Sequence, residues 1–431
     1  MFSAESLGLP RRLSANLILT CASTPRELEA VAACHAATFG QHELAAILAN
    51  SRDYPGSVPQ QVLYVEDTQT GQPVSSINLT LETWTYEGIP LRIGEVAVVS
   101  TLEAYRKQGL IREQFRVCHQ MAREAGCLLS IIAGIPYYYR QFGYEYILPL
   151  DGGWNLRPDQ VPDLSGDQSS PYRLRPANAQ DMPTLMRFHA EATRDFCVAG
   201  TLTEDVWRYQ DSLPEGCSDR KMTFLLERNG EPAGYMRLMA HENDMEGPWH
   251  KGLQIKEAYL PRRDDCLAAL RFARKMTLEE RQLQMIKVHI PVSIPFTQIV
   301  KELGGEWQRP YAWQVRVLDR VRLLQGIAPI LEKRLAASPF AGLTQDFGMG
   351  LYDEVLVLQF REGRLQAVIS TPEAERHLTC SPTVFPMIWL GYRSVDEVLL
   401  WYPDALRKDA ASQELGQVLF PKRDSWVVTL F

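Results

Sequence analysis

The sequence predicts an α+β protein with mixed sheets that is divided into more than one domain. Three observations lead to this fold class. A chain of 431 residues is too long for one hydrophobic core, so two or three domains are expected. Residues 94–146 read as a strand, a turn, an amphipathic helix, a second strand and a tyrosine-rich helical turn. Residues 157–171 lose this periodicity in favour of Pro, Asp, Ser and Gly, which indicates a linker or an exposed connection.

The first fifty residues predict helices that precede the strands. Residues 23–50 carry apolar side chains at helical spacing, and Thr24, Pro25 and Glu27 form a capping-box start signal. Residues 61–66 and 73–84 read as strands joined by a hairpin-type turn at 67–71. Helices followed by a strand meander therefore lead into the segment 94–146.

The segment 96–111 joins a strand to a helix through a basic turn. Residues 96–100 are apolar and β-branched, and the helix that follows has apolar residues at helical spacing: Leu110, Ile111, Phe115, Cys118 and Met121. Free N–H groups at a helix start attract pyrophosphate, Arg106 and Lys107 add positive charge, and Gly109 lets a ligand approach the backbone. A lone Arg-x-x-Gly is common, so the turn by itself gives only a phosphate-binding hypothesis.

The tyrosines after the second predicted strand make this hypothesis more specific. Residues 128–133 read as a buried strand, and Tyr-Arg-Gln-Phe-Gly-Tyr follows at 139–144. With Arg-Lys-Gln-Gly-Leu-Ile at 106–111, this order resembles the GNAT acetyltransferases, whose Arg-x-x-Gly-x-(Gly/Ala) loop holds the acetyl-CoA pyrophosphate. It is most similar to the enhanced intracellular survival (Eis) branch, which typically reads R-R-R-G-L-L and Y-G-R-F-G-Y. Ile111 stands where many GNAT proteins carry a small residue, a departure that the Eis branch shares.

Residues 171–319 resemble a second GNAT domain that lacks the phosphate site. Residues 172–190 look like the start of such a domain, and Asn229-Gly230 turns a predicted hairpin. At the position of the phosphate turn, residues 260–267 contain no glycine, and Asp264 and Asp265 would repel pyrophosphate. The corner at 303–305 has no tyrosine in the three residues before it. We therefore expect a degenerate, structural repeat.

The chain changes character again at residue 320. One helical stripe over 321–335 precedes two strands joined at 361–364. The Gly-Tyr-Arg-Ser turn at 391–394 and Leu-Phe-Pro at 419–421 resemble the sterol-carrier-protein-like domain that closes Eis-type chains. The expected architecture is tandem GNAT domains followed by a sterol-carrier-protein-like α/β domain, over residues 1–160, 171–319 and 320–431.

The resemblance implies a binding site for acetyl-CoA as co-substrate. Backbone groups of three strand residues would contact the pantetheine arm, namely Val98, Val99 and Ser100. The loop and helix start would hold the pyrophosphate, through Arg106, Lys107, Gln108, Gly109, Leu110 and Ile111.

The spacing of the tyrosines assigns a general acid. Tyr139 stands three residues before the Phe-Gly-Tyr corner, so by analogy with the motif it would protonate the leaving thiolate. The alternative is that the tyrosines at 137, 138, 139 and 144 only form an aromatic corner. No His or Glu of the first domain presents itself as the base, but the Eis resemblance supplies the C-terminal carboxylate, here that of Phe431. The alternative for Phe431 is a simply packed terminal strand.

Composition limits the partners. The net charge of −7 argues against nucleic acid and suits cationic substrates, although only weakly. Because no secretory start and no run of eighteen apolar residues occurs, we expect a soluble, cytoplasmic protein with no membrane partner. The eight cysteines are scattered singly and predict reduced, mostly buried thiols. The eight histidines show no metal-site clustering, so we expect no metal.

The expected function is an Eis-like, acetyl-CoA-dependent N-acetyltransferase of primary amines, with aminoglycosides and other polycationic amines as candidate acceptors. The resemblance also implies a homo-oligomer, because family members form trimers and hexamers. Two rival functions are open. One is a lipid- or sterol-binding protein in which the acetyltransferase fold is only a scaffold, and the other is an acyl-CoA sensor without turnover.

Overall fold

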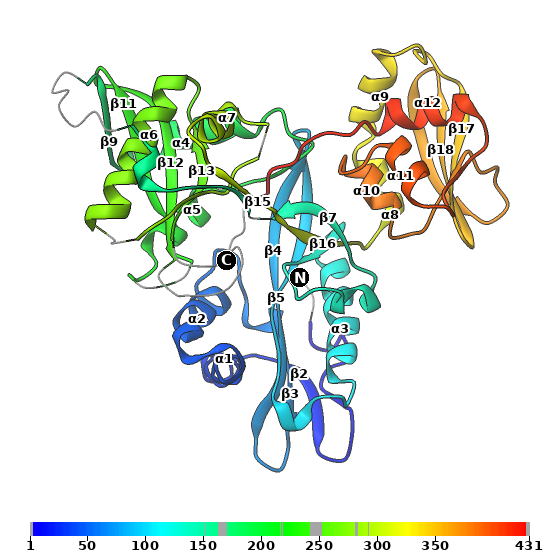
Figure 1. The fold of residues 1–431 in the computed structure, drawn as a ribbon. Helices are drawn as coiled ribbons and strands as arrows, with labels where there is room; N and C mark the ends of the chain where they lie inside the picture. Colours follow the sequence, from blue (N-terminus) through cyan, green and yellow to red (C-terminus); the bar gives the residue numbers. More distant parts are fainter. Residues whose placement is uncertain are drawn as a thin grey trace.

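The computed structural model describes residues 3–150, 152–162, 170–215, 217, 219–241, 252–280, 283–291 and 293–427. They form three sheets with flanking helices, shown along the chain in Figure 1. No helix in these ranges is long and apolar enough to cross a membrane. The predicted α+β class with mixed sheets is confirmed.

The first sheet carries the segment with the predicted phosphate turn. Its order is β1-β2-β3-β4-β5-β6-β16-β7, with β10 paired to β4. In Figure 1, α1 and α2 lie on one side of β4 and β5, and α3 lies on the other. The bounds are β1 Arg11–Arg12, β2 Leu17–Cys21, α1 Pro25–Phe39, η1 Gln41–Glu43, α2 Leu44–Arg52, η2 Pro59–Gln61, β3 Val62–Asp67, β4 Gln72–Tyr86, β5 Ile89–Thr101, η3 Glu103–Tyr105, α3 Leu110–Glu124, β6 Leu129–Ile132, η4 Tyr138–Phe142, β7 Glu145–Leu150, β10 Val198–Gly200 and β16 Tyr311–Val317.

The N-terminal elements form as the sequence predicts. Helix α1 begins after Thr24, whose hydroxyl accepts the Glu27 N–H at 3.3 Å. The Glu27 carboxylate accepts the Thr24 N–H at 2.8 Å in return. This reciprocal pairing satisfies N–H groups that a helix start would leave free. The predicted hairpin, the strand before the basic turn and the helix after it are also present, as β3–β4, β5 and α3.

The second sheet repeats the arrangement of the first. Its order is β15-β8-β14-β13-β12-β11-β9, and its parallel pair β13–β14 is joined by helix α6, as β5–β6 is joined by α3. The Asn229-Gly230 hairpin forms as predicted, with φ angles of 53° and 83°. The bounds are β8 Gly153–Leu156, η5 Pro158–Gln160, β9 Tyr172–Pro176, η6 Ala179–Asp181, α4 Met182–Thr193, α5 Glu204–Ser212, β11 Met222–Arg228, β12 Glu231–His241, β13 Gly252–Tyr259, α6 Arg263–Lys275, η8 Met276–Glu280, β14 Ile286–Val288, α7 Pro295–Glu302 and β15 Glu306–Gln308.

The two sheets exchange strands across the expected domain boundaries. Strand β8 precedes residue 160 but pairs with β14 and β15 of the second sheet. Strand β16 precedes residue 319 but lies between β6 and β7 of the first sheet. Neither segment therefore completes its sheet from its own residues. Local sequence patterns predict strands but not which strands pair, so this exchange cannot be predicted from the sequence.

In the second sheet's segment, a carboxylate occupies the N-terminal turn of helix α6. One oxygen of Asp265 accepts the Arg262 N–H at 3.1 Å, and the other accepts from Arg228 at 3.0 Å. Asp265 is fully buried, so this charge stands where an anion would approach the N-terminus of α6.

The C-terminal segment forms a third, five-stranded sheet of order β19-β18-β17-β20-β21. The predicted hairpin at 361–364 is present between β18 and β19. The single helix expected over 321–335 is instead two helices, α8 and α9, because Pro329 in the first turn of α9 has no N–H to continue α8. Strand β17 was not predicted. The bounds are α8 Arg320–Gly326, α9 Ala328–Ala336, β17 Gln345–Leu351, β18 Glu354–Arg361, β19 Arg364–Thr371, β20 Leu378–Thr379, α10 Phe385–Trp389, α11 Val395–Trp401, β21 Leu406–Arg407 and α12 Ala410–Leu419.

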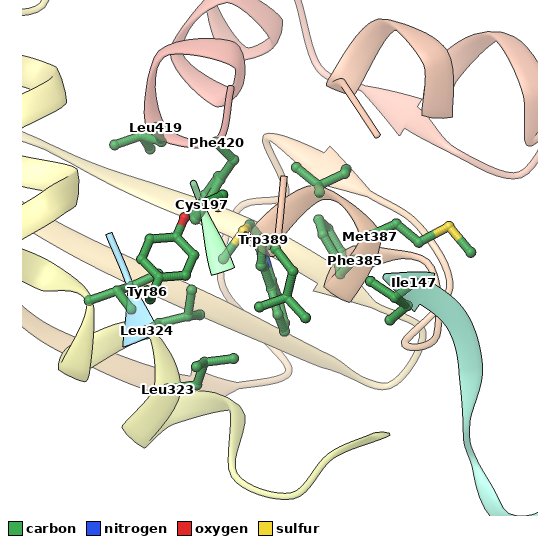
Figure 2. Packing of buried hydrophobic residues seen from close by; sticks show 14 of the residues in the cluster. Tyr86, Ile147, Cys197, Leu323, Leu324, Phe385, Met387, Trp389, Leu419 and Phe420 are labelled. Atoms are coloured by element: carbon green, nitrogen blue, oxygen red, sulfur yellow. Dashed lines mark hydrogen bonds between the residues drawn. The ribbon is translucent and has the colours of Figure 1, made fainter. Parts of the chain in front are cut away.

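The third sheet and its helices share a hydrophobic core with the first sheet. Figure 2 shows Tyr86 of β4 close to Leu324 of α8, within the same cluster as Trp389 of α10. Arg334 donates to the Tyr86 hydroxyl at 3.1 Å, and Arg423 donates to Glu87 at 2.8 Å. This docking fixes the β4–β5 hairpin at the end of β5 that lies away from the basic turn.

Candidate active site

Strands β5 and β6 separate where the predicted co-substrate residues begin. Their parallel pairing covers Ile93 to Glu95 of β5 and does not continue beyond Glu95. The register of β5 against β4 then shifts, and Val98 adopts a φ of 46°. This bulge turns the strand away from β6 and leaves backbone groups of residues 96–100 without a partner strand on that side. A V-shaped opening results.

A single cavity of about 1210 Å³ occupies this opening. It is lined by every predicted co-substrate residue and by the predicted acid, which are Val98, Val99, Ser100, Arg106, Lys107, Gln108, Gly109, Leu110, Ile111 and Tyr139. The structure therefore brings together all the predicted site residues that it describes. Phe431 lies outside the described residues.

One end of the cavity is suited to phosphate groups. Helix α3 starts after Gly109, which has a φ of 78°, and no side chain caps its first turn. Within the described chain, none of the N–H groups of residues 107–111 donates a hydrogen bond. Arg106, Lys107 and Arg112 line the same end. Unsatisfied N–H groups at a helix N-terminus, flanked by cations, bind a pyrophosphate anion.

A buried hydrogen-bond network supports the bulge of β5. The Ser100 hydroxyl lies 2.8 Å from Nδ1 of His35, and the Ser76 hydroxyl lies 3.0 Å from Nε2 of the same ring. Burial lowers the pKa of His35 to about 3, so the ring is neutral at neutral pH. The Ser100 carbonyl also accepts from the Ser75 hydroxyl at 3.0 Å, so the network holds the side chain and the backbone of this residue. No local sequence pattern predicts this role for His35.

Tyr139 lies in the middle of the cavity wall, on the short helix η4. Its ring packs over Gly134 and beside Phe115, with 5.8 Å between the centroids of the two rings. Burial raises the pKa of Tyr139, and the neighbouring Tyr138 adds to the shift, so the phenol keeps its proton. Tyr138 also lines the cavity, whereas Tyr137 is 73% exposed and does not.

A buried pair of carboxyl groups lies beyond Tyr139 and was missed in the sequence. Glu95 of β5 lines the cavity, and its carboxyl group hydrogen-bonds to that of Glu82 on β4. Burial raises the pKa of Glu95, and the charge of Glu82 raises it further. The sequence does contain one indication of this pair, a glutamate directly before the apolar run at 96–99. A charged residue in a buried strand is rare unless its side chain is paired.

At the far wall of the cavity, helix α2 contacts residues from the segment that forms the second sheet. Asn50 of α2 donates to Asp219 at 2.8 Å, and the Tyr209 hydroxyl of α5 donates to Asn50 at 2.6 Å. Asp219, Glu95 and Glu43 all line this end. The cavity thus has cations at the helix start and carboxylates at the opposite end, a polarity that suits an anionic co-substrate and a cationic second substrate.

The described residues contain no group of three or more His, Cys, Asp or Glu side chains placed to hold a metal ion. The acid–base groups around the cavity include the phenols of Tyr105, Tyr138 and Tyr139, the imidazole of His42 and the carboxylates already named. Their arrangement can deliver a proton at the middle of the cavity and accept one at its far end.

Comparisons with known proteins agree with this geometry. A sequence profile of the acetyltransferase (GNAT) domain matches residues 22–147. No curated protein sequence matches the chain significantly.

Solved structures share the fold over nearly the whole chain. A GCN5-related N-acetyltransferase from Anabaena variabilis has a TM-score of 0.70 at 12% identity, over 96% of this chain and 100% of that one. A GCN5-related N-acetyltransferase from Kribbella flavida has a TM-score of 0.65 at 16% identity, over 96% of this chain and 100% of that one. Eis1 from Mycobacterium abscessus has a TM-score of 0.62 at 11% identity, over 96% of this chain and 100% of that one. Residues 22–147 are therefore a GNAT N-acetyltransferase domain, and an acyl-CoA is its co-substrate.

Proposed function

We propose that this protein is an acetyl-CoA-dependent N-acetyltransferase that acts on primary amines, with aminoglycosides and other polycationic amines as candidate acceptors. One observation carries the proposal. A single cavity holds an open, cationic helix start at one end, a protonated tyrosine in the middle and carboxylates at the other end. Acetyl transfer from a thioester to an amine needs these three groups in this order.

The residues present fit the co-substrate. N–H groups of residues 107–111, with Arg106 and Lys107, would bind the pyrophosphate. Backbone groups of residues 98–100 would pair with the amides of the pantetheine arm, because the bulge separates them from β6. The thioester carbonyl would then lie near Tyr139, where β5 and β6 separate.

Tyr139 is the proposed proton donor to the leaving thiolate. Its raised pKa keeps it protonated in the free enzyme. A thiolate is a weaker base than a phenolate in water, but one that departs in a shielded cavity is desolvated and becomes more basic, so the proton moves from the phenol to sulfur as the C–S bond breaks.

Glu95 is a proposed proton acceptor for the amine. A carboxylate of ordinary pKa, about 4.3, is a poor base for an ammonium group. Burial and Glu82 make Glu95 more basic, and its position in the cavity opposite the cations suits a positively charged acceptor. The C-terminal carboxylate of Phe431, which the Eis resemblance implies, is the competing candidate.

We also propose that the whole chain has the domain arrangement of Eis-type proteins. The likeness in fold to Eis1 from Mycobacterium abscessus over 96% of the chain supports an Eis-type arrangement, with 320–431 as a sterol-carrier-protein-like domain. By the same resemblance we propose a homo-oligomer, a trimer or a hexamer, which sedimentation equilibrium would test.

The deciding experiment measures thiol release from acetyl-CoA with a panel of primary amines, including an aminoglycoside and a polyamine. Acceptor-dependent release is expected, together with an acetylated product of the added mass. Acetyl-CoA binding without release for any amine would favour the acyl-CoA sensor. Absence of acetyl-CoA binding would favour the lipid-binding alternative.

A further inference from the structure

A second cavity lies in the segment of the second sheet, where the pairing of β13 with β14 ends. This parallel pairing covers three residues, as does that of β5 with β6. The residues that follow in the second sheet are Lys256 and 289–291, and they line the second cavity. The residues at the same register in the first sheet are Val96 and 132–134, and they line the active-site cavity. The two sheets therefore have cavities at equivalent positions.

The second cavity is too small for an acyl-CoA. Its volume is about 240 Å³, against about 1210 Å³ for the active-site cavity. Residues 260–267 surround the start of α6, and none of these described residues lines the second cavity. Asp265 already occupies that helix start. Because pockets for drug-sized ligands begin at about 300 Å³, a ligand of the second cavity is smaller than that and carries no nucleotide.

The exchange of strands between the first two sheets builds the base of this cavity. The chain reaches β8 at Gly152 and reaches β16 at Pro310, and both residues line the cavity. A methyl group on Gly152 would come within 2.3 Å of the Cα atom of Pro310, so the two crossings are in contact. A methyl group on Gly153 would come within 2.4 Å of the Val288 carbonyl oxygen. These close backbone contacts hold the base of the cavity in place.

Residues 422–427 form another wall of the second cavity. In Figure 1 the chain after α12 is drawn in red, and it crosses from the third sheet toward the first two sheets. The Arg423 N–H donates to the Gly391 carbonyl at 2.9 Å, and the Trp426 N–H donates to the Val198 carbonyl of β10 at 2.8 Å. The wall is thus held by backbone hydrogen bonds to the C-terminal segment at one end and to the first sheet at the other.

Two of the cations that line the cavity share one carboxylate. Lys422 donates to Glu397 at 2.6 Å, and Arg393 lies 3.6 Å from the same carboxylate. The side chains of Lys422 and Arg393 are 50% and 42% exposed, so both can meet a ligand that enters from solvent. One carboxylate neutralises only one of the two cations, which leaves a positive charge on this side of the cavity.

Arg423 also lines the cavity and shares a second carboxylate. It donates to Glu87 at 2.8 Å, and Arg334 donates to the same group. The described lining residues add one more cation, the buried Lys256, and one carboxylate, that of Asp424. Cations therefore outnumber carboxylates around the cavity in the described part of the chain. A surface with this balance attracts an anion.

The rest of the lining is apolar and partly aromatic. Trp307 of β15 is 50% exposed, and its ring packs edge-on against Trp154 with 5.4 Å between the ring centroids. Prolines at 149, 291 and 310 line the same cavity. An aromatic ring gains both apolar burial and ring contacts on such a surface. The lining therefore suits a ligand that has an apolar ring as well as a negative charge.

We propose that the second cavity binds a small aromatic carboxylate. The carboxylate would pair with the excess positive charge at Lys422 and Arg393, through charge-assisted hydrogen bonds. The ring would pack against Trp307 and the prolines. This inference does not rest on the proposed function, because none of the described residues that line the second cavity lines the active-site cavity.

The first test measures binding of 4-fluorobenzoate to the full chain by ¹⁹F NMR line broadening. The neutral 4-fluorobenzamide has nearly the same shape and should bind about tenfold more weakly, because it cannot form charge-assisted hydrogen bonds as an acceptor anion. Trifluoroacetate is a carboxylate without a ring and should also bind about tenfold more weakly. Equal affinity for the benzoate and either comparison compound would overturn the proposed ligand class. No binding of 4-fluorobenzoate up to about 10 mM would overturn the site.

Variants then locate the bound 4-fluorobenzoate. Trp307→Ala and Lys422→Gln should each weaken its binding about fivefold or more, because they remove the ring contact and one cation. The matched controls are Trp401→Ala and Lys408→Gln, which change a 71% exposed tryptophan and a lysine paired with Glu375, neither of which lines the cavity. The control variants should bind as wild type does. Wild-type affinity in both Trp307→Ala and Lys422→Gln would overturn the location, and their Tm values show whether each variant folds.

A competition experiment separates the second cavity from the active site. Saturating acetyl-CoA should leave the affinity for 4-fluorobenzoate unchanged, because the two cavities share no described lining residue. Displacement of 4-fluorobenzoate by acetyl-CoA would place it in the active-site cavity and overturn the inference. Binding that is unchanged by acetyl-CoA and lost in Trp307→Ala would support the second site, whether or not any amine is acetylated.

Discussion

The ring of Tyr139 lies so close to Gly134 that a methyl group on that glycine would come within 2.0 Å of Cε2 of the ring. Gly134 follows β6, and its carbonyl accepts from Gln314 of β16 at 2.9 Å, so the backbone there is held in place. Gly134→Ala should displace the Tyr139 ring and lower kcat about 100-fold, since small misplacements at a reacting centre cost this much. Steady-state kinetics would check it.

Gly326→Ala is the matched control for this change. Gly326 ends helix α8, and an added methyl group there meets no atom within 4 Å. Full activity in this variant with a loss in Gly134→Ala would place the effect at the tyrosine. Full activity in both would show that the position of Tyr139 does not limit turnover.

Tyr139→Phe should lower kcat by about 10² or more while the affinity for acetyl-CoA stays unchanged, because a general acid contributes about this factor. The ring keeps its packing on Phe115, so calorimetric binding of acetyl-CoA should match wild type. Tyr137→Phe, a change to a 73% exposed tyrosine that does not line the cavity, is the control. An unchanged kcat in Tyr139→Phe would reject this residue as the acid.

Gly109→Glu should abolish acetyl-CoA binding. The residue has a φ of 78°, so a side chain strains the backbone, and a carboxylate at the helix start repels pyrophosphate. Gly88→Glu makes a matched control, because Gly88 has a φ of 86°, meets nothing within 4 Å and lies in the β4–β5 turn away from the phosphate end. Isothermal titration should find binding lost only at Gly109. Equal losses in both variants would indicate general unfolding.

The fragment 1–160 should fail to fold as a native domain. It lacks β16, whose Trp313 is fully buried and T-stacks on Trp84 of β4 with 6.0 Å between ring centroids. Without β16, strands β6 and β7 lose their common neighbour, and β8 has no sheet to join. Circular dichroism and amide-proton dispersion would measure this. A native-like spectrum for the fragment would show that the exchanged strand is dispensable.

Structural features that depend on neighbouring residues could be predicted from the sequence, whereas contacts between distant segments could not. The cap at Thr24, the hairpin at Asn229 and the open helix start at Gly109 follow from neighbouring residues, and all were predicted. The motif spacing also placed Tyr139 on the same cavity as the basic turn.

The pairing of strands that lie far apart in the sequence could not be predicted from local patterns. The partnership of Glu82 with Glu95 depends on the register of two strands, and the place of β16 in the first sheet depends on a contact across about 180 residues of chain. Local periodicity contains neither relationship. The candidate acid was therefore identified from the sequence, whereas Glu95, which we propose as the proton acceptor, was not.

The identity of the proton acceptor can be decided by comparing Glu95→Gln with deletion of Phe431. If Glu95 is the base, Glu95→Gln should lower kcat/KM about 100-fold or more and remove its acid limb, because the rate must rise as Glu95 loses its proton through its raised pKa. Glu66→Gln, on strand β3 and outside the cavity lining, is the control and should retain full activity. If the C-terminal carboxylate is the base, the deletion should lower activity while the Tm stays at the wild-type value, and Glu95→Gln should retain it. A loss only in Glu95→Gln would reject, for this protein, the base that the Eis resemblance implies.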